Sequence, residues 1–261
     1  LIIMKIIVIL EKYGGYCNRL FQSLHYHAYS IEKGIKFFNP SMLGLLKFDN
    51  KFFYTFDRLN NFFLKCIFKF LKFIFRKNYV CFYLDKNNYI KIVGGWNFRK
   101  YKLIEKHNKE LNKIYRFESE NFSKGTKILI SYLENLKKKG KYIIGLHIRR
   151  NDYKYWNSGK YYFSDDFYQL VINNLRINFI KKNKDPFFVV VSDEKISSEM
   201  GFNLLSNGSW KEDQIILQNC DLLVGPPSTF TMWASYISQI PLIKISSDNE
   251  KDFVKGEVCN G

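Results

Sequence analysis

The chain has 261 residues, of which 46% are hydrophobic and 25% carry a charge. This apolar fraction excludes a disordered chain and suffices for one large core or two small ones. Lys and Arg number 41 against 24 Asp and Glu, and the resulting formal charge of +17 indicates an anionic partner: a nucleic acid, an acidic membrane surface or a phosphorylated substrate.

The cysteines and the first residues bear on the compartment. Five cysteines are scattered without a CxxC pair, which argues against a zinc site or a disulfide framework and favours a reducing compartment. The apolar run after Met4 and Lys5 spans only 6–10, shorter than a signal-peptide core and far too short to cross a membrane. We therefore interpret it as a buried strand and expect a cytoplasmic protein, or one peripheral on the inner face of a membrane.

Short apolar runs alternate with amphipathic stretches, which is typical of parallel α/β units. In the first half, strands are predicted over 5–10, 35–38, 79–84 and 89–93, and a helix over 19–33 that Gly34 closes. In the second half, strands are predicted over 141–148, 187–192, 221–224 and 241–245, and helices over 123–139, 165–181, 211–219 and from Ser228. No Pro/Gly/Ser-rich linker interrupts the series. We therefore expect two Rossmann-like domains, 1–125 and 126–261, facing a central cleft.

Ligands of open α/β sheets bind beyond the carboxyl ends of the strands, so the residues after each apolar run are candidates for the site. After the first strand, Gly14 and Gly15 let the backbone approach a ligand, and the following helix offers free N–H groups to an anion. A tight strand-to-helix turn needs glycine in any case, so both interpretations stay open. The loop has neither the GxGxxG spacing of a dinucleotide fold nor the GxxxxGK of a P-loop.

The strand over 141–148 runs into two adjacent arginines. Alternation along the strand sends His147 and Arg149 to one face and Arg150 to the other. Arginines at the end of an apolar strand are costly unless they meet an anion or a carboxylate, and two of them suit a phosphate. The alternative is that Arg150 pairs with Asp152 while Arg149 faces solvent.

Polar residues follow two further strands. Asp193, after the strand over 187–192, either accepts hydrogen bonds from a ribose or base or caps the next helix. Ser228 and Thr229 open a helix, as an ordinary N-cap or as part of a phosphate site. Together these loops describe a site for a nucleoside diphosphate. Because no DxD sequence occurs in the chain, protein cations rather than a metal ion are expected to bind the pyrophosphate.

Four blocks in the right order resemble the α-1,2-fucosyltransferases, and through them the metal-independent group that includes α-1,6- and protein O-fucosyltransferases. They are GGYCNRLFQ at 14–22, GGWNFRKY at 94–101 followed by IYRFES, HIRRNDY at 147–153, and DQIILQNCDLLVGPPSTFTMWASYI at 213–237. The resemblance implies a GT-B fold, with the acceptor on the first domain and GDP-fucose bound mainly by the second. It also implies inverting transfer of fucose to a hydroxyl of a glycan acceptor, in an α-1,2 linkage, without a metal ion or other cofactor.

The resemblance also implies roles for individual residues. Arg149 and Arg150 would hold the pyrophosphate, and Asp152 would order their loop or lie beside the reacting sugar. His147 would lie near the nucleoside, and Asp213 would read guanine. The other donor-binding candidates are Gly14, Gly15, Asn18, Asp193, Ser228 and Thr229.

Two points stay open within the resemblance. Asn151 stands where the family usually has glycine, although asparagine tolerates left-handed backbone better than most residues; this departure keeps a different nucleotide sugar, or a non-catalytic relative, as alternatives. The general base is Asp152, Glu11 or His25, but Glu11 also suits a cap and His25 lies on a helix that must bury one face. A strongly dissociative transfer needs little help from a base.

Residues 61–77, NFFLKCIFKFLKFIFRK, place cations at intervals of four, three and four among Phe, Leu and Ile. A helix would carry the cations as one stripe, which is typical of a helix lying on an anionic bilayer, and an ordinary helix packed on the first domain has the same pattern. Such a contact would suit a lipid-linked glycan acceptor. We expect no nucleic-acid partner, because no RRM, KH or helix-turn-helix signature is present.

Overall fold

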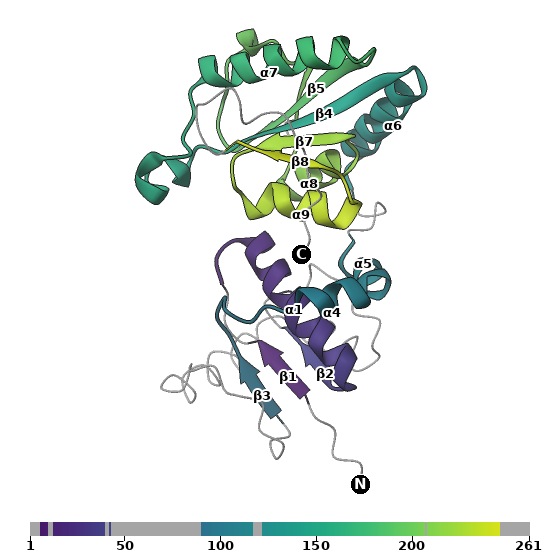
Figure 1. The fold of residues 1–261 in the computed structure, drawn as a ribbon, viewed down its shortest axis with the longest axis vertical. Helices are drawn as coiled ribbons and strands as arrows, with labels where there is room; N and C mark the ends of the chain where they lie inside the picture. The colour runs from purple at the N-terminus through teal and green to yellow at the C-terminus, as the bar shows by residue number, and fades with distance from the viewer. Residues whose placement is uncertain are drawn as a thin grey trace. The chain divides into compact units, whose positions relative to one another are not determined.

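The structure, a computed structural model, describes residues 6–9, 13–39, 42, 90–116, 122–206 and 208–245. The chain divides into two compact units, Leu1–Phe117 with Asn260–Gly261, and Glu118–Cys259. We call them unit 1 and unit 2. Each contains a parallel sheet covered by helices (Figure 1).

Unit 1 is built on a sheet of order β2-β1-β3, with both neighbours parallel to the central strand. Its elements are β1 (Ile6–Ile9), α1 (Tyr16–Lys33), β2 (Lys36–Phe38), β3 (Ile90–Val93), α4 (Tyr101–Lys106) and α5 (Asn108–Tyr115). Leu20, Leu24 and Ala28 recur every four residues and are fully buried, so they form the face of α1 that packs against its neighbours. Gly34 ends α1 at φ 60°, where its N–H donates to the carbonyl of Ile31.

Unit 2 is built on a five-stranded parallel sheet of order β6-β5-β4-β7-β8. Its strands are β4 (Lys141–Ile148), β5 (Asp185–Ser192), β6 (Leu204–Leu205), β7 (Leu222–Gly225) and β8 (Leu242–Lys244). The central strand β4 pairs with β5 along its whole length, from Lys141 opposite Asp185 to Ile148 opposite Ser192. Its last six residues are buried or nearly so, as expected of a parallel strand that is covered on both faces.

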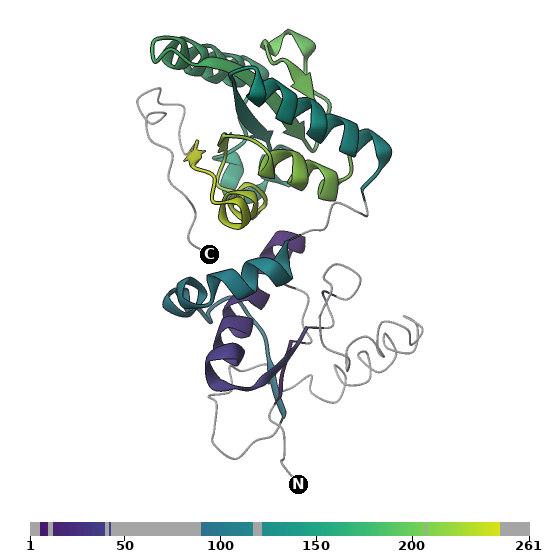
Figure 2. The same cartoon turned by 90° about the vertical axis from the view of Figure 1, so that its right-hand side faces the viewer.

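Helices cover both faces of this sheet. They are α6 (Lys124–Lys138), α7 (Asp165–Ile180), α8 (Trp210–Gln218) and α9 (Thr229–Ser238), with short 3-10 turns η3 (Asp152–Lys154), η4 (Trp156–Gly159) and η5 (Ser198–Met200). Helix α7 lies on one face, and α6, α8 and α9 lie on the other (Figures 1 and 2). Ser123 and Thr126 at the start of α6 donate to one carboxylate oxygen of Glu212 in α8 over 2.5 and 2.6 Å, which ties these two helices together.

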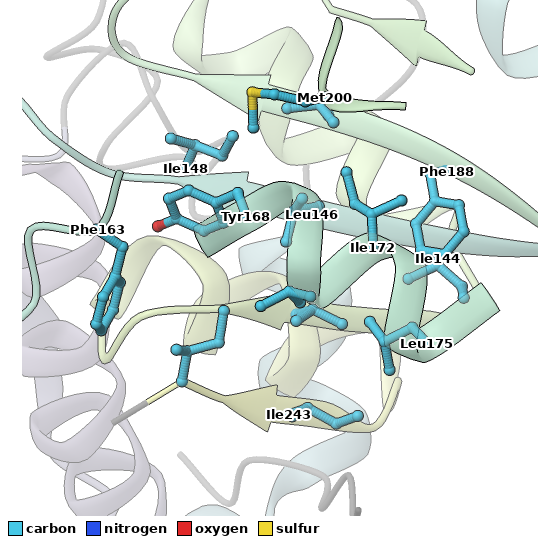
Figure 3. Close-up of a cluster of buried hydrophobic side chains, with 14 of the residues drawn as sticks. Ile144, Leu146, Ile148, Phe163, Tyr168, Ile172, Leu175, Phe188, Met200 and Ile243 are labelled. Carbon is cyan, nitrogen blue, oxygen red and sulfur yellow. The ribbon is translucent and has the colours of Figure 1, made fainter. Parts of the chain in front are cut away.

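A core of unit 2 lies between α7 and the sheet. Tyr168, Ile172 and Leu175 extend from α7 toward side chains of β4 and β5 (Figure 3). These three positions recur at intervals of four and three, so they share one face of the helix. All three are 2% exposed or less, which makes this face the apolar contact of α7 with the sheet.

The predicted α/β class is confirmed, and most predicted elements lie where the sequence placed them. Helix α1 begins three residues earlier than predicted, at Tyr16. Helices α4 and α5 and the two-residue strand β6 were not predicted. The predicted strand over 79–84 and the basic aromatic stretch over 61–77 lie outside the described residues. In the part of the chain that the structure describes, no helix is both long and apolar enough to cross a membrane.

Candidate functional site

The candidate site in unit 2 lies where the order of the strands in its parallel sheet reverses. The chain passes from β4 to β5 on one side and later places β7 on the other side of β4, so the ends of β4 and β7 form a topological switch point. Such points are where open α/β sheets bind ligands. The residues that follow β4, β5 and β7 are those that the sequence singled out.

Arg149 follows β4 and is held by two carboxylates. Its Nη2 lies 2.7 Å from Asp152 Oδ1, and its Nη1 lies 3.0 Å from Asp193 Oδ2. The other oxygen of Asp193 accepts a hydrogen bond of 2.9 Å from the backbone N–H of Arg150. One carboxylate therefore fixes both the guanidinium of Arg149 and the backbone beyond it, while the Arg149 side chain stays 32% exposed.

Two of the alternatives that the sequence left open for this loop do not hold in the structure. Arg149, not Arg150, pairs with Asp152. Asp193 caps no helix, because the next turn of helix begins only at Ser198 and both oxygens of Asp193 bind the arginine loop. Asn151 has φ −20° and ψ −87°, so its backbone does not use the left-handed region that glycine would favour.

Arg150 points into unit 2 and is bound by internal groups. Its Nε donates to the carbonyl of Phe163 over 3.1 Å, its Nη2 forms an ion pair with Asp165, and its side chain is buried. The guanidinium lies 5.8 Å from the ring of Tyr168 in α7. Arg150 thus anchors the loop to the start of α7, whereas Arg149 presents its charge near the surface.

His147, the penultimate residue of β4, is buried and hydrogen-bonded. Its Nδ1 lies 2.6 Å from the hydroxyl of Thr231 in α9, and its ring packs 5.0 Å from that of Phe230. Burial, and to a smaller extent the charge of Arg149, lower the pKa of His147 to about 3. The imidazole is therefore neutral at physiological pH. A Cβ at Gly225 in β7 would approach the His147 carbonyl to 3.0 Å, so the two strand ends pack closely.

Ser228 is the N-cap of α9, as predicted. Its hydroxyl accepts a hydrogen bond of 3.2 Å from the N–H of Phe230, and Thr229 is the first residue of the helix. The hydroxyl of Tyr153 donates to the carbonyl of Pro227 over 2.5 Å and also hydrogen-bonds to Ser228. Tyr153 therefore joins the arginine loop to the N-terminus of α9, where free N–H groups favour an anion.

Asp213 lies on α8 beside the edge strand. Its Oδ1 accepts a hydrogen bond of 2.5 Å from the hydroxyl of Ser206, whose N–H in turn donates to the carbonyl of Val190 in β5. Burial raises the pKa of Asp213 to about 6, although the Ser206 hydrogen bond opposes the shift. The carboxyl therefore titrates close to neutrality rather than near its usual value.

The glycine loop of unit 1 is shaped around Asn18. Gly14 has φ 58°, and a Cβ there would collide with the Asn18 amide, so glycine is required on both counts. Gly15 is the N-cap of α1 and brings no side-chain cap. Gln22 donates from Nε2 to the carbonyl of Gly95 over 2.8 Å, which joins the start of α1 to the segment after β3.

Of the three candidates for the general base, His25 is not available in this structure. It is 1% exposed, its Nδ1 accepts a hydrogen bond of 3.0 Å from the backbone N–H of Lys100, and burial lowers its pKa to about 3. His25 thus positions the segment after β3. Asp152 keeps an exposed carboxylate, paired with Arg149, and Glu11 lies outside the described residues.

Sequence reasoning missed Tyr153 and Thr231 as parts of the site. Both stand within the motif blocks, Tyr153 at the end of HIRRNDY and Thr231 in PSTFT, so their place in those blocks was the available signal. Among the described residues, no group of three or more His, Cys, Asp or Glu side chains is arranged to hold a metal ion.

The chain is similar to known glycosyltransferases. A model of glycosyl transferase family 11 matches residues 40–258. No curated protein sequence matches the chain.

Solved fucosyltransferase structures share its fold. The fucosyltransferase NodZ from Bradyrhizobium is 14% identical over 94% of this chain and 96% of its own, with a TM-score of 0.53. A variant of Arabidopsis thaliana FUT1 in complex with GDP is 14% identical over 97% of this chain and 74% of its own, with a TM-score of 0.53. NodZ α-1,6-fucosyltransferase soaked with GDP-fucose is 13% identical over 97% and 98%, with a TM-score of 0.50. These likenesses confirm the predicted GT-B fold class.

Proposed function

Because the chain belongs to glycosyl transferase family 11, we propose that it transfers fucose from GDP-fucose to a hydroxyl of a glycan acceptor. The proposed reaction inverts the anomeric carbon, forms an α-1,2 linkage and needs no metal ion. The family match supports the reaction class. The related structures that hold GDP or GDP-fucose support the donor, and the acceptor and linkage rest on the resemblance of the four sequence blocks.

The observation that carries this proposal is the position of Arg149. Its guanidinium lies at the switch point of the sheet, partly exposed and fixed by Asp152 and Asp193 before any ligand binds. Cleavage of the sugar–phosphate bond leaves negative charge on the departing β-phosphate. A cation fixed in advance stabilises that charge without reorganisation, an effect worth several kcal/mol for one well-placed donor.

The two arginines have different roles in the proposed site. Arg149 contacts the pyrophosphate, while Arg150 positions the loop through its bonds to Phe163 and Asp165. The N-terminus of α9, with Ser228 and Thr229, provides a second anion-binding group beside the loop.

The remaining assignments follow the sequence predictions. His147 lies beside the nucleoside and Asp213 reads guanine. Gly14, Gly15 and Asn18 of unit 1 stay donor-binding candidates on the resemblance alone. Asp193 is reassigned by its contacts from the substrate to the arginine loop. Membrane contact through residues 61–77 stays a prediction, and sedimentation with anionic and neutral liposomes tests it.

Donor binding is tested by the thermal shift that GDP, GDP-fucose, GDP-mannose and UDP cause, each with and without EDTA. We expect GDP and GDP-fucose to stabilise the wild type regardless of EDTA. Arg149→Ala should lose this stabilisation by GDP and GDP-fucose and transfer fucose about 10²-fold more slowly. It should also lower the melting temperature of the free protein, because its ion pair with the largely buried Asp193 is lost, so the ligand-induced shift is measured against the variant's own melting temperature.

Arg150→Ala is the matched control, because it removes the same charge from a buried ion pair. We expect it to lower the melting temperature of the free protein. Fucose transfer by Arg149→Ala within a fewfold of wild type would refute the catalytic assignment. If UDP raises the melting temperature and the GDP compounds do not, the donor is a UDP-sugar rather than GDP-fucose.

A further inference from the structure

An aromatic loop follows Arg149 and projects from unit 2. It spans residues 153–162, YKYWNSGKYY, and includes the turns η3 and η4. In Figure 1 this segment curls away from the sheet at the left of unit 2, between β4 and α7. Its rings are exposed to an unusual degree: Tyr155 is 79%, Trp156 48% and Tyr162 40% exposed.

The rings within this loop are ordered. The ring of Trp156 lies 4.9 Å from that of Tyr153 at 34° and 5.4 Å from that of Tyr161 at 30°. Asn157 and Ser158 have φ of 50° and 56°, and Gly159 has φ 74°, so the chain reverses tightly between Trp156 and Tyr161. Left-handed backbone at two residues that are not glycine costs free energy, and the ring contacts across the reversal offset that cost.

The aromatic loop is continuous with the candidate donor site. Tyr153, its first ring, is buried and donates to the carbonyl of Pro227 before α9. The guanidinium of Arg149 lies 5.8 Å from the centre of the Tyr153 ring. A row of rings therefore leads from the arginine proposed to bind the pyrophosphate, through Trp156, to the exposed surface of unit 2.

We propose that the aromatic loop binds sugar rings of the acceptor glycan, with Trp156 and Tyr155 as the principal contacts. This inference rests on the proposed function, because it names a binding surface for the second substrate of that reaction. It places this surface on unit 2, whereas the resemblance placed the acceptor on the first domain. The C–H face of a pyranose packs on Trp and Tyr rings, and the hydroxyl, amide and ammonium groups of this loop suit its hydroxyls. Trp156 is already fixed by its neighbours, so little ordering is needed when a ligand binds.

The composition of the loop favours a carbohydrate over a lipid bilayer. From Tyr153 to Tyr162 it contains no Leu, Ile, Val, Met or Phe, whereas a loop that inserts among acyl chains buries such side chains. It also contains no carboxylate, and its two charged residues are Lys154 and Lys160. The loop therefore offers aromatic faces with polar edges, which match the two kinds of surface on a sugar.

The test compares Trp156→Leu with Tyr132→Leu. Tyr132 on α6 is 46% exposed, close to the 48% of Trp156, but lies outside the aromatic loop. It is therefore a matched control for losing an exposed ring. The probes are lactose, N-acetyllactosamine, diacetylchitobiose and mannobiose. Saturation-transfer NMR measures their binding without GDP-fucose, and steady-state kinetics measure the KM for the acceptor, the hydrolysis of GDP-fucose and the affinity for GDP.

We expect Trp156→Leu to raise the acceptor KM roughly three- to tenfold and to weaken saturation transfer. GDP affinity and GDP-fucose hydrolysis should stay at wild-type levels, and Trp156→Phe should recover part of the loss. Tyr132→Leu should behave as wild type in every assay.

Several results would overturn the inference. One is that the wild type binds none of the four sugars. The others are that Trp156→Leu leaves the acceptor KM unchanged, or that it weakens GDP binding as much as acceptor binding. If Trp156→Leu loses the binding of the wild type to vesicles of anionic phosphatidylglycerol but keeps sugar binding, the loop is a membrane contact instead. If the wild type binds a sugar but transfers no fucose, and Trp156→Leu loses that binding, the proposed reaction is wrong while the glycan-binding surface is confirmed.

Discussion

Asp193 is expected to be a positioning residue whose loss destabilises unit 2 far more than the loss of Asp152. Both carboxylates bind the same guanidinium, at 3.0 and 2.7 Å, but Asp193 is 16% exposed and Asp152 60% exposed. Asp193 also accepts the backbone N–H of Arg150. The two variants Asp193→Ala and Asp152→Ala therefore compare a half-buried pair that has a second hydrogen bond with an exposed pair that has none.

The size of the effect follows from these contacts. Hydrogen bonds to a charged group contribute about 1.5–3 kcal/mol each, and Asp193→Ala removes two such interactions and leaves the Arg150 amide without its carboxylate. We expect it to lower the free energy of unfolding by about 3 kcal/mol. Asp193→Asn keeps an oxygen for the amide and should cost about half as much. An exposed pair contributes about 0–1 kcal/mol, which sets the expectation for Asp152→Ala.

Calorimetry of the full chain measures this difference. For a unit of this size, about 3 kcal/mol lowers the melting temperature by roughly 6–12 °C, and below 1 kcal/mol the change is a few degrees at most. Hydrogen exchange of peptides that contain Arg150 gives a local readout, and Asp193→Ala should accelerate exchange there. Equal destabilisation by Asp193→Ala and Asp152→Ala would refute the reasoning, as would unchanged exchange at Arg150.

Three further results are expected. Folding raises the pKa of Asp213 from 3.8 to about 6, so the folded chain holds an extra proton between these pH values. The free energy of unfolding should therefore fall by up to about 3 kcal/mol as pH rises from about 4 to about 6. Asp213→Asn should remove this pH dependence from melting curves taken across that range. Gly145→Ala should destabilise by about 1–3 kcal/mol, because its Cβ would lie 2.8 Å from the Cys220 sulfur, whereas Gly125→Ala, with its nearest neighbour at 3.8 Å, should be neutral or slightly stabilising in urea unfolding. Burial raises the pKa of Cys220 to about 12, so peptide mapping after iodoacetamide treatment should find Cys220 unmodified in the native chain and modified in urea.

The elements that the sequence predicted most accurately are the strands of the buried parallel sheet, because their apolar runs stand out from the polar sequence around them. The strand predicted over 141–148 has the same first and last residues as β4. Its residues between Lys141 and Arg149 are apolar except for His147, and this made the strand easy to predict. Helices α4 and α5 were missed because their exposed faces dominate the pattern: between Tyr101 and Tyr115 only Ile104, Leu111 and Tyr115 are buried. Strand β6 has two residues and is defined by its pairing with β5, which no local pattern reveals.

The site was predicted as a set of residues but not as a set of contacts. The alternation rule separated Arg149 from Arg150, yet it left open which one is buried. That was decided by Phe163 and Asp165, which follow the aromatic loop in the chain and reach back to Arg150. Asp193 looked like a helix cap because a carboxylate after a strand often is one, and only the tertiary structure places it against the arginines.

The order of strands in unit 2 has a consequence for synthesis on the ribosome. Strand β4 emerges first but lies at the centre of the sheet, where Ile144 and Leu146 pair later with Leu222 and Val224 of β7. After β5 has emerged, one edge of β4 stays open until about thirty more residues have been made. An open apolar strand edge is a template for pairing with another chain. Nascent chains arrested between residues 192 and 222 therefore still present this open edge and are expected to bind chaperones.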